Sequence, residues 1–302
     1  MLIYAKSALK KKDIDTKIAI GCDGIEIQLL SELVDGKIGR YFKADEVFKL
    51  EDFKDYPIDV IHCPLLCSYG LSDVNIESFA CNDFSLFEQV CYIADYFGKI
   101  KSKNTLVVVH SELNIDNMIA VDILRKVVST VSYMLMKYTN IEIAIENVTP
   151  LRKVYKDEIY FCNNFHFDNI KLAKYIRKEL NTDRVGTCID ICHAMITNRY
   201  MKEIYRKLND IEYKDFTLDN YFEQNRDIVK LVHLADFKGN GYGKGKHGIR
   251  FTNQTKDRLS YILSLYDKYN YKCPVTLEVE ETDYLVCDGY KETRETILSL
   301  TV

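Results

Sequence analysis

Acidic and histidine side chains recur at the ends of short apolar runs along this chain. Six of the eight runs end in such residues, which are His62, His110, Glu146, Asp190 followed by His193, His233 and Glu278. A single histidine or glutamate in such a position is most often a hydrogen-bonded structural residue or the first solvated loop residue. Chance is a poor explanation for so many in one chain, so we expect these side chains to act together.

Carboxylates and imidazoles that converge without matched cationic partners repel one another and lose hydration unless a cation lies among them. A set of this kind without sulfur suits Zn²⁺, Mn²⁺ or Mg²⁺ better than a structural thiolate site does. We therefore predict that these strand-end side chains form a divalent-metal site. The cysteines that flank these ligands are expected to be small buried hydrophobes rather than ligands.

The elements that must position these residues are short β-branched or aliphatic runs, each followed by a stretch with helical spacing or a polar loop. The predicted strands are Leu2–Ala5, Gly24–Leu29, Asp59–Pro64, Thr105–His110, Ile141–Asn147, Gly186–Asp190, Lys230–Asp236 and Pro274–Glu280. The predicted helices include Ser85–Phe97, Met118–Lys137, Asn169–Leu180, Asp219–Asp227, Thr255–Tyr269 and Tyr290–Leu300. Strands that alternate with helices imply a parallel sheet with right-handed crossovers.

Eight such units predict an α/β fold of the (β/α)8 barrel type, formed by one domain over residues 1–302. The competing architecture is a doubly wound open sheet. It would need a glycine-rich phosphate turn after an early strand, and the sequence has none. In a parallel barrel all strand C-termini open on one face, so the polar ends of the runs should converge there.

The composition is typical of a soluble chain with a substantial core and no general affinity for polyanions. Apolar residues make up 47% of the 302 residues, the net charge is -4 and the pI is near 5.9. Non-specific nucleic-acid binding depends on clustered Lys and Arg, which this balance does not favour. The N-terminus lacks the apolar core of a signal peptide, and no run approaches the roughly 20 apolar residues of a membrane span. Ten scattered cysteines complete the expectation of a cytoplasmic protein with reduced thiols.

The segment 237–250 combines several glycines with lysines and an arginine. Glycine lets the backbone approach a ligand closely, and cations suit a phosphate or carboxylate. Lys238, Lys246 and Arg250 are therefore candidate contacts to an anionic substrate. A solvated loop whose lysines aid solubility is an equal alternative. His166 lies in another loop and is expected to be structural.

Segments along most of the chain resemble the superfamily of xylose-isomerase-like barrels, which holds sugar isomerases and epimerases together with endonuclease IV. The segments are Asp23–Ile27, Val107–His110, Ile145–Asn147, Cys188–Ala194, Val232–Asp236 and Leu277–Glu278. Each motif is weak alone, but their order and spacing carry the resemblance from the second predicted strand to the eighth.

For the isomerase and epimerase branch, the resemblance implies that Glu146, Asp190, His233 and Glu278 are the central ligands and hold one divalent metal. Glu146 and Glu278 would be the catalytic pair that exchanges protons with adjacent carbons of the sugar, while the metal polarises substrate oxygens. His193 would contact a substrate oxygen, and Glu26 is a candidate for the same role.

For the endonuclease branch, the resemblance implies a three-zinc site that hydrolyses phosphodiesters at abasic DNA. The further ligands would be His62, His110, His193 and His247. The aspartate that this branch has two residues before its last histidine is replaced here by Gly245. This missing ligand and the acidic pI favour the sugar enzyme.

These features predict a divalent-metal-dependent isomerase or epimerase of a sugar or sugar phosphate. A zinc-dependent AP endonuclease is the alternative. A barrel that only binds a ligand is a third hypothesis, and the presence of both Glu146 and Glu278 argues against it. The expected partner is a small-molecule sugar, nucleic acid is less favoured, no membrane association is expected, and a homo-oligomer is left open.

Overall fold

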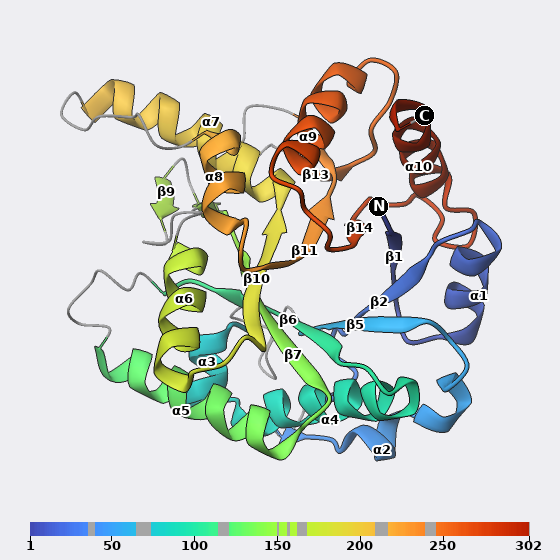
Figure 1. Cartoon of the computed structure of the whole chain (residues 1–302), viewed down its shortest axis with the longest axis vertical. Helices are drawn as coiled ribbons and strands as arrows, with labels where there is room; N and C mark the ends of the chain where they lie inside the picture. Colours follow the sequence, from blue (N-terminus) through green and yellow to red (C-terminus); the bar gives the residue numbers. More distant parts are fainter. Residues whose placement is uncertain are drawn as a thin grey trace.

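The computed structural model describes residues 1–35, 40–64, 74–113, 121–149, 151–155, 158–161, 168–208, 217–238 and 246–301. Eight of its strands form a closed parallel barrel (Figure 1). They are β1 (Ile3–Ser7), β2 (Gly24–Gln28), β5 (Ile58–His62), β6 (Thr105–Ser111), β7 (Ile141–Asn147), β10 (Val185–Asp190), β11 (Val229–Leu234) and β14 (Val275–Leu277). Their order around the barrel is β1-β14-β11-β10-β7-β6-β5-β2. The predicted (β/α)8 fold is therefore confirmed.

Helices surround the barrel and carry the chain from one strand to the next (Figure 1). They are α1 (Lys11–Ala19), α2 (Ala44–Val47), α3 (Ile76–Cys81), α4 (Phe84–Lys101), α5 (Val121–Lys137), α6 (Asp168–Leu180), α7 (Ile191–Leu208), α8 (Leu218–Asn225), α9 (Lys256–Lys268) and α10 (Asp288–Leu300), with a 3-10 helix at Leu50–Phe53. The first residues of the predicted helix Met118–Lys137 lie outside the described part of the chain. Within that part, none of the helices has the length and apolar character needed to cross a bilayer.

Helix α4 illustrates why these helices pack on the barrel. Leu86, Val90 and Phe97 recur at helical spacing and are almost completely buried. Burial of one large apolar side chain contributes about 1.5–3 kcal/mol. Packing of this face on the barrel therefore stabilises a helix that would be only marginally stable in isolation. The helix ends at Ser102, whose φ of 51° turns the chain in the left-handed region before β6 begins.

The barrel interior alternates along each strand between residues that face inward and residues that face the helices. The inward apolar layer consists of Tyr4, Val60, Leu106, Val108, Ala144, Cys188 and Leu231. Gly24 leaves room for it, because a Cβ atom at this position would lie 2.5 Å from the ring of Tyr4. Two positions beyond members of this layer, on the same strands, stand Lys6, His62, His110, Glu146, Asp190 and His233. The same alternation therefore turns a polar layer inward at the C-terminal mouth of the barrel.

Three antiparallel two-stranded sheets lie outside the barrel sheet. They are β3 (Val34–Asp35) with β4 (Arg40–Tyr41), β8 (Leu151–Tyr155) with β9 (Glu158–Phe161), and β12 (Asp236–Lys238) with β13 (Lys246–Ile249). The predicted strand Lys230–Asp236 is thus divided, because β11 ends at Leu234 and β12 starts at Asp236. This division matters for the site, since β13 carries His247 back to the mouth of the barrel.

Candidate metal centre

The C-terminal mouth of the barrel brings together the four predicted central ligands. Glu146, Asp190, His233 and Glu278 each offer one ligand atom, and these atoms lie within 4.8 Å of one another. Among the further groups that meet the same criterion and share a member with the central one, two contain the remaining predicted ligands. They are His62, His110 and Glu146 on one side, and Asp190, His193 and His247 on the other. All eight predicted ligand residues therefore lie in three contiguous groups.

The hydrogen bonds of His62 define which of its nitrogens faces the centre. Its Nδ1 lies 2.8 Å from the carbonyl oxygen of Cys63 and donates to it, so Nε2 is left as an acceptor. Nε2 lies 3.0 Å from Oε2 of Glu146, which is also an acceptor. Burial and the charge of Lys6 lower the pKa of His62, although Glu146 opposes them. A metal cation between these atoms is therefore more favourable than a proton.

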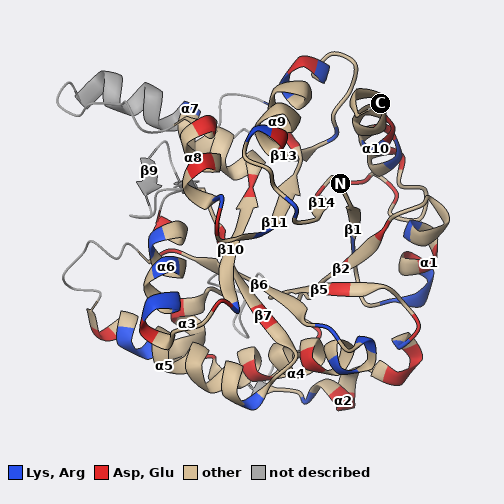
Figure 2. Cartoon of the chain, viewed as in Figure 1, with Lys and Arg blue, Asp and Glu red and all other residues tan. Residues whose placement is uncertain are grey.

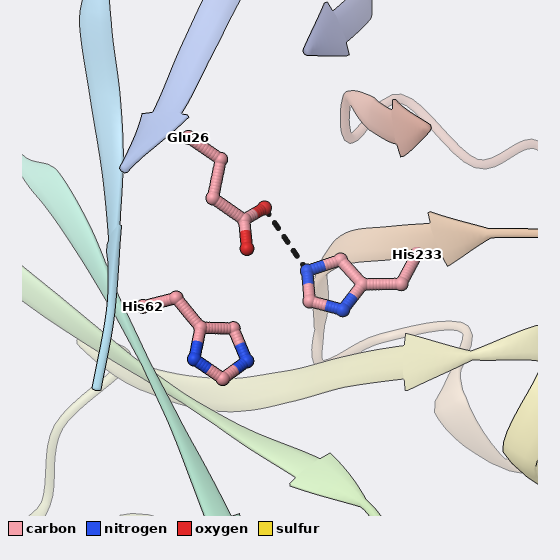
Figure 3. Close-up of side chains that lie close together, drawn as sticks. All are labelled: Glu26, His62 and His233. Carbon is pink, nitrogen blue, oxygen red and sulfur yellow. Dashed lines mark hydrogen bonds and ion pairs between the residues drawn. The ribbon is translucent and has the colours of Figure 1, made fainter. Parts of the chain in front are cut away.

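Glu26 orients the imidazole ring of His233. The Nε2–H group of His233 donates to Oε2 of Glu26 at 3.0 Å, and Figure 3 shows these side chains pointing toward each other beside His62. The remaining nitrogen, Nδ1, lies 3.3 Å from Glu146 Oε1 and 3.2 Å from Glu278 Oε2. Burial alone would raise the pKa of Glu26, but His233 and Lys6 lower it to about 2. A carboxylate on the far nitrogen of a histidine is the usual arrangement behind a metal-binding imidazole.

The spacing of Asp190 and His193 is explained by the start of α7. Asp190 precedes the first helical residue, and its Oδ1 accepts the backbone N–H of His193 at 2.6 Å, as a helix-capping aspartate does. Its Oδ2 lies 3.3 Å from His193 Nδ1 and 3.3 Å from His247 Nε2. One carboxylate thus begins the helix with one oxygen and joins the candidate metal centre with the other.

Asn147 is a positioning residue to which the sequence analysis assigned no role. Its side chain donates to the carbonyl oxygen of Asp190 at 2.9 Å and accepts from the Asp190 N–H at 2.8 Å. Its own carbonyl oxygen accepts from Nδ1 of His193 at 2.9 Å, which leaves Nε2 of His193 available to a ligand. Asn147 follows Glu146 at the end of β7, so its position beside a predicted ligand could have indicated a role. Its partners depend on the three-dimensional pairing of β7 with β10.

Lys6 is the second residue that sequence reasoning missed. Its Nζ lies 2.6 Å from Glu278 Oε1 and 3.5 Å from Glu26 Oε1. Burial opposes the charge of Lys6, but these two carboxylates and Glu146 raise its pKa. The alternation from Tyr4 could have indicated an inward side chain on β1, although not its partners.

The carboxylates of Glu278 and Glu146 are suited to a divalent cation. Oε2 of Glu278 is buried and accepts no well-formed hydrogen bond among the described residues, although it lies 3.2 Å from Nδ1 of His233. Burial alone would raise the pKa of Glu146, yet His233 and His110 hold it well below its usual range, so this carboxylate stays ionised. An unsatisfied buried carboxylate oxygen is costly, and a bound metal ion would satisfy it. Carboxylate oxygens with imidazole nitrogens are donors that zinc, manganese and magnesium accept.

Cys188 lies beneath this centre in the apolar layer. Its sulfur is within 4.8 Å of ligand atoms of Glu146 and His233. Burial raises the pKa of its thiol, and that shift disfavours the thiolate that a metal would bind. The Cys188 sulfur therefore lies close to the centre but stays a neutral thiol, which is a poor metal ligand.

A cavity of about 480 Å³ opens beside the centre, within the size range of small-molecule sites. Lys6, Gln28, His247 and Glu278 are among the residues that line it. The cavity therefore connects the candidate metal ligands with space for a substrate.

The residues predicted to contact the substrate lie in different environments. Glu26 is completely buried and contacts His233 and Lys6. Lys238 is exposed at the end of β12, and Arg250 is exposed and pairs with Glu292 at 3.1 Å. The side chain of Lys246, residues 239–245 and His166 lie outside the described residues.

Comparison with known proteins gives a family and a set of similar folds. The family described as xylose isomerase-like TIM barrel matches residues 19–300. No curated protein matches the sequence.

Three solved structures illustrate the similarity of fold. A D-tagatose 3-epimerase-like protein is 17% identical with a TM-score of 0.58, and the match covers 100% of this chain and 98% of that one. A D-allulose 3-epimerase from Methylomonas sp. is 10% identical with a TM-score of 0.59, over 99% and 98% of the two chains. A xylose isomerase-like TIM barrel protein from Mycobacterium smegmatis in complex with magnesium is 12% identical with a TM-score of 0.50, over 99% and 95%.

Proposed function

We propose a function from the premise that this chain belongs to the xylose isomerase-like TIM barrel family. The proposed function is that of a divalent-metal-dependent isomerase or epimerase of a sugar or sugar derivative, formed by one domain. The observation that carries the proposal is the pair Glu146 and Glu278, whose carboxylates lie 3.3 Å and 3.2 Å from the same nitrogen of His233. Two carboxylates beside one metal-ligand group can act as the bases in proton transfer between sugar carbons.

A cation held by Glu146, Asp190, His233 and Glu278 would polarise the carbonyl and hydroxyl oxygens of the substrate. Glu278 stands at the cavity wall with 22% of its side chain exposed, whereas that of Glu146 is 1% exposed. One ionised carboxylate takes a proton from a substrate carbon and can return the same proton to the neighbouring carbon. For delivery to the opposite face, the other carboxylate must first take up a proton from water and then transfers it to the carbon.

Two neighbouring side chains support this pair. Lys6 holds the second oxygen of Glu278, and this ion pair keeps the carboxylate ionised and fixed in orientation. His193 has its Nδ1–H committed to the Asn147 carbonyl, so its Nε2 remains available to a substrate oxygen.

The test is the incorporation of solvent deuterium into substrate carbons, followed by NMR. Metal-loaded wild-type protein is screened with ketoses, ketose phosphates and inososes in deuterated buffer. Glu146→Gln and Glu278→Gln keep the size of the side chain and a coordinating oxygen but lose the base. Each should reduce exchange by about 10²-fold or more.

Glu142→Gln is the matched control, because Glu142 lies at the other end of β7 and pairs with Lys230 at 2.6 Å. Its exchange rate should equal that of wild type. If no candidate sugar exchanges with the wild-type protein, the proposed function loses its support. Equal exchange in the two glutamine variants at the centre would instead refute the roles given to Glu146 and Glu278.

An AP endonuclease with three zinc ions is the second candidate, and one observation favours it. The groups His62, His110, Glu146 and Asp190, His193, His247 flank the central group, although a single-metal sugar enzyme needs only the centre. Gly245 stands where that branch has a further aspartate ligand, and this substitution opposes the candidate.

Metal content and DNA cleavage separate the two candidates. The sugar enzyme predicts about one metal ion per chain and negligible incision of an abasic-site duplex with added Zn²⁺. The endonuclease predicts about three ions and turnover of roughly 1 per second or faster. Should incision occur, Gly245→Asp is expected to increase it further by restoring the missing ligand type.

A further inference from the structure

We infer that the cavity beside the metal centre contains a subsite for an anionic substituent, a phosphate ester or a carboxylate, with Lys17 as its cationic contact. This inference rests on the proposed sugar enzyme and names its substrate class. The substrate would be a sugar that carries a negative charge away from its reacting carbons.

Lys17 is unusual because it is a buried lysine without a carboxylate partner. It lies on α1 and is 4% exposed, and its Nζ lies 5.2 Å from the centre of the Tyr290 ring. No carboxylate oxygen of the described residues lies within 4.0 Å of this ammonium group. An aromatic face attracts a cation but supplies no hydrogen-bond acceptor of the kind that a carboxylate or phosphate offers to an ammonium.

One cavity connects Lys17 with the metal centre. Lys17 and Glu278 both line the space of about 480 Å³, so a molecule at the metal centre can extend toward α1. Lys6 also lines this cavity, but Glu278 and Glu26 already neutralise it. The two lysines therefore differ in role, since Lys6 belongs to the carboxylates of the centre and Lys17 has a positive charge to offer a ligand.

Two acidic residues on the cavity wall oppose an anion and restrict where it binds. Asp13 lies one helical turn before Lys17 on α1, and Glu280 follows β14. Ser7 and Gln28 contribute neutral polar groups to the wall. An anionic group should therefore bind at Lys17, and its affinity should reflect the balance between Lys17 and Asp13.

The first test measures binding of inorganic phosphate, and in a second arm acetate, by calorimetry. Lys17→Met preserves the length of the apolar stem and should weaken phosphate binding by roughly 10-fold or more. Asp13→Asn should strengthen it. Lys12→Met is the matched control, because Lys12 is exposed on the same helix, and it should bind as wild type does.

The outcomes of this test are distinct. Phosphate binding that is equal in wild type and Lys17→Met would locate the anion at the metal centre and overturn the inference. If Lys17→Met fails to fold, Asp13→Asn still decides, because unchanged affinity for both phosphate and acetate in that variant would also overturn it. A preference for phosphate over acetate would identify the substituent as a phosphate ester, and the reverse a carboxylate.

The second test separates this inference from the proposed function. In the deuterium-exchange assay, Lys17→Met should raise KM for an anionic sugar by roughly 10-fold while the uncharged sugar is unaffected. If Lys17→Met changes KM equally for the anionic and the uncharged sugar, the anionic subsite is refuted and the sugar enzyme is left intact. Lys17-dependent phosphate binding without exchange of any sugar would refute the sugar enzyme and leave the anion site.

Discussion

The two ends of the barrel each contain a partly buried network of charged side chains, and the networks differ in how complete they are. At the N-terminal end, Asp59 pairs with Lys101 at 2.6 Å and with Lys103 at 2.8 Å, and accepts a hydrogen bond from Tyr4 at 2.9 Å. At the C-terminal mouth, four carboxylates face one lysine and several histidines. Figure 2 shows acidic residues along the barrel strands as well as on the outer helices.

This difference distinguishes a structural network from a binding site. Asp59 has hydrogen-bonding cations of its own, so nothing from outside is required to stabilise it. The buried Oε2 of Glu278 has only the His233 imidazole beside it and accepts no well-formed hydrogen bond among the described residues, and His62 directs an acceptor nitrogen at Glu146. The mouth of the barrel is therefore the end at which a cation from solution should bind.

The largest effect is expected from removal of a central ligand. Asp190→Ala or His233→Ala should lose nearly all bound metal, because the remaining carboxylates repel one another when a ligand is absent. Metal content per chain, measured by mass spectrometry, is the readout. Asp59→Asn is the matched control at the other end of the barrel and should retain the wild-type content. Wild-type content in both ligand variants would show that the ligand set is wrong.

Metal removal should lower the melting temperature of the wild-type protein, since an ion that binds only the folded state stabilises it. At a free concentration of 100 times Kd this stabilisation is about 2.7 kcal/mol. A chelator should therefore shift wild type and Asp59→Asn equally and leave Asp190→Ala unchanged. A comparable shift in Asp190→Ala would indicate that the stabilising ion binds elsewhere.

A smaller effect is expected at Glu26, which contacts the far nitrogen of His233 rather than the candidate ion. Glu26→Gln keeps an acceptor oxygen but removes the negative charge, and the affinity for metal should fall by roughly 10- to 100-fold. Competition with a fluorescent chelator measures this change, and Glu142→Gln serves as the control. Affinity equal to wild type would show that Glu26 does not orient His233.

The strands and the candidate ligands could be predicted from the sequence because both follow one local rule. His62, His110, Glu146, Asp190 and His233 each stand two positions beyond an apolar residue of the barrel interior. Alternation along a strand thus gives the fold and the direction of the ligand side chain together.

The partners of these ligands could not be predicted, because they depend on contacts between distant parts of the chain. Lys6 meets Glu278 at a separation of 272 residues, and Asn147 meets Asp190 at 43. Lys17 was missed for another reason. A lysine on a polar nine-residue helix indicates a solvated surface, and only the packing of α1 against Tyr290 and the cavity shows that it is buried.

The smallest effect is expected in the charged network around Asp59 at the N-terminal end of the barrel, and it should depend on pH. Burial would raise the pKa of Asp59, but Lys101, Lys103 and Tyr4 lower it below its ordinary value. A carboxylate with a lowered folded-state pKa contributes stability above the unfolded-state pKa of about 3.9, and this contribution is lost as the pH falls through the folded-state value. Asp59→Asn should therefore reduce the free energy of unfolding by about 1–3 kcal/mol at pH 7.

The difference between wild type and Asp59→Asn should persist down to about pH 5 and shrink below about pH 4. Urea unfolding of both proteins at a series of pH values measures it, with chelator present so that acid release of metal from the mouth does not contribute. Because Lys101 also donates to the Ile58 carbonyl, it retains one partner in the variant, and the loss should stay modest. A difference that is independent of pH down to acid unfolding would mean that Asp59 acts through its shape and not its charge. In that case the contrast between the two ends of the barrel would no longer rest on charge compensation.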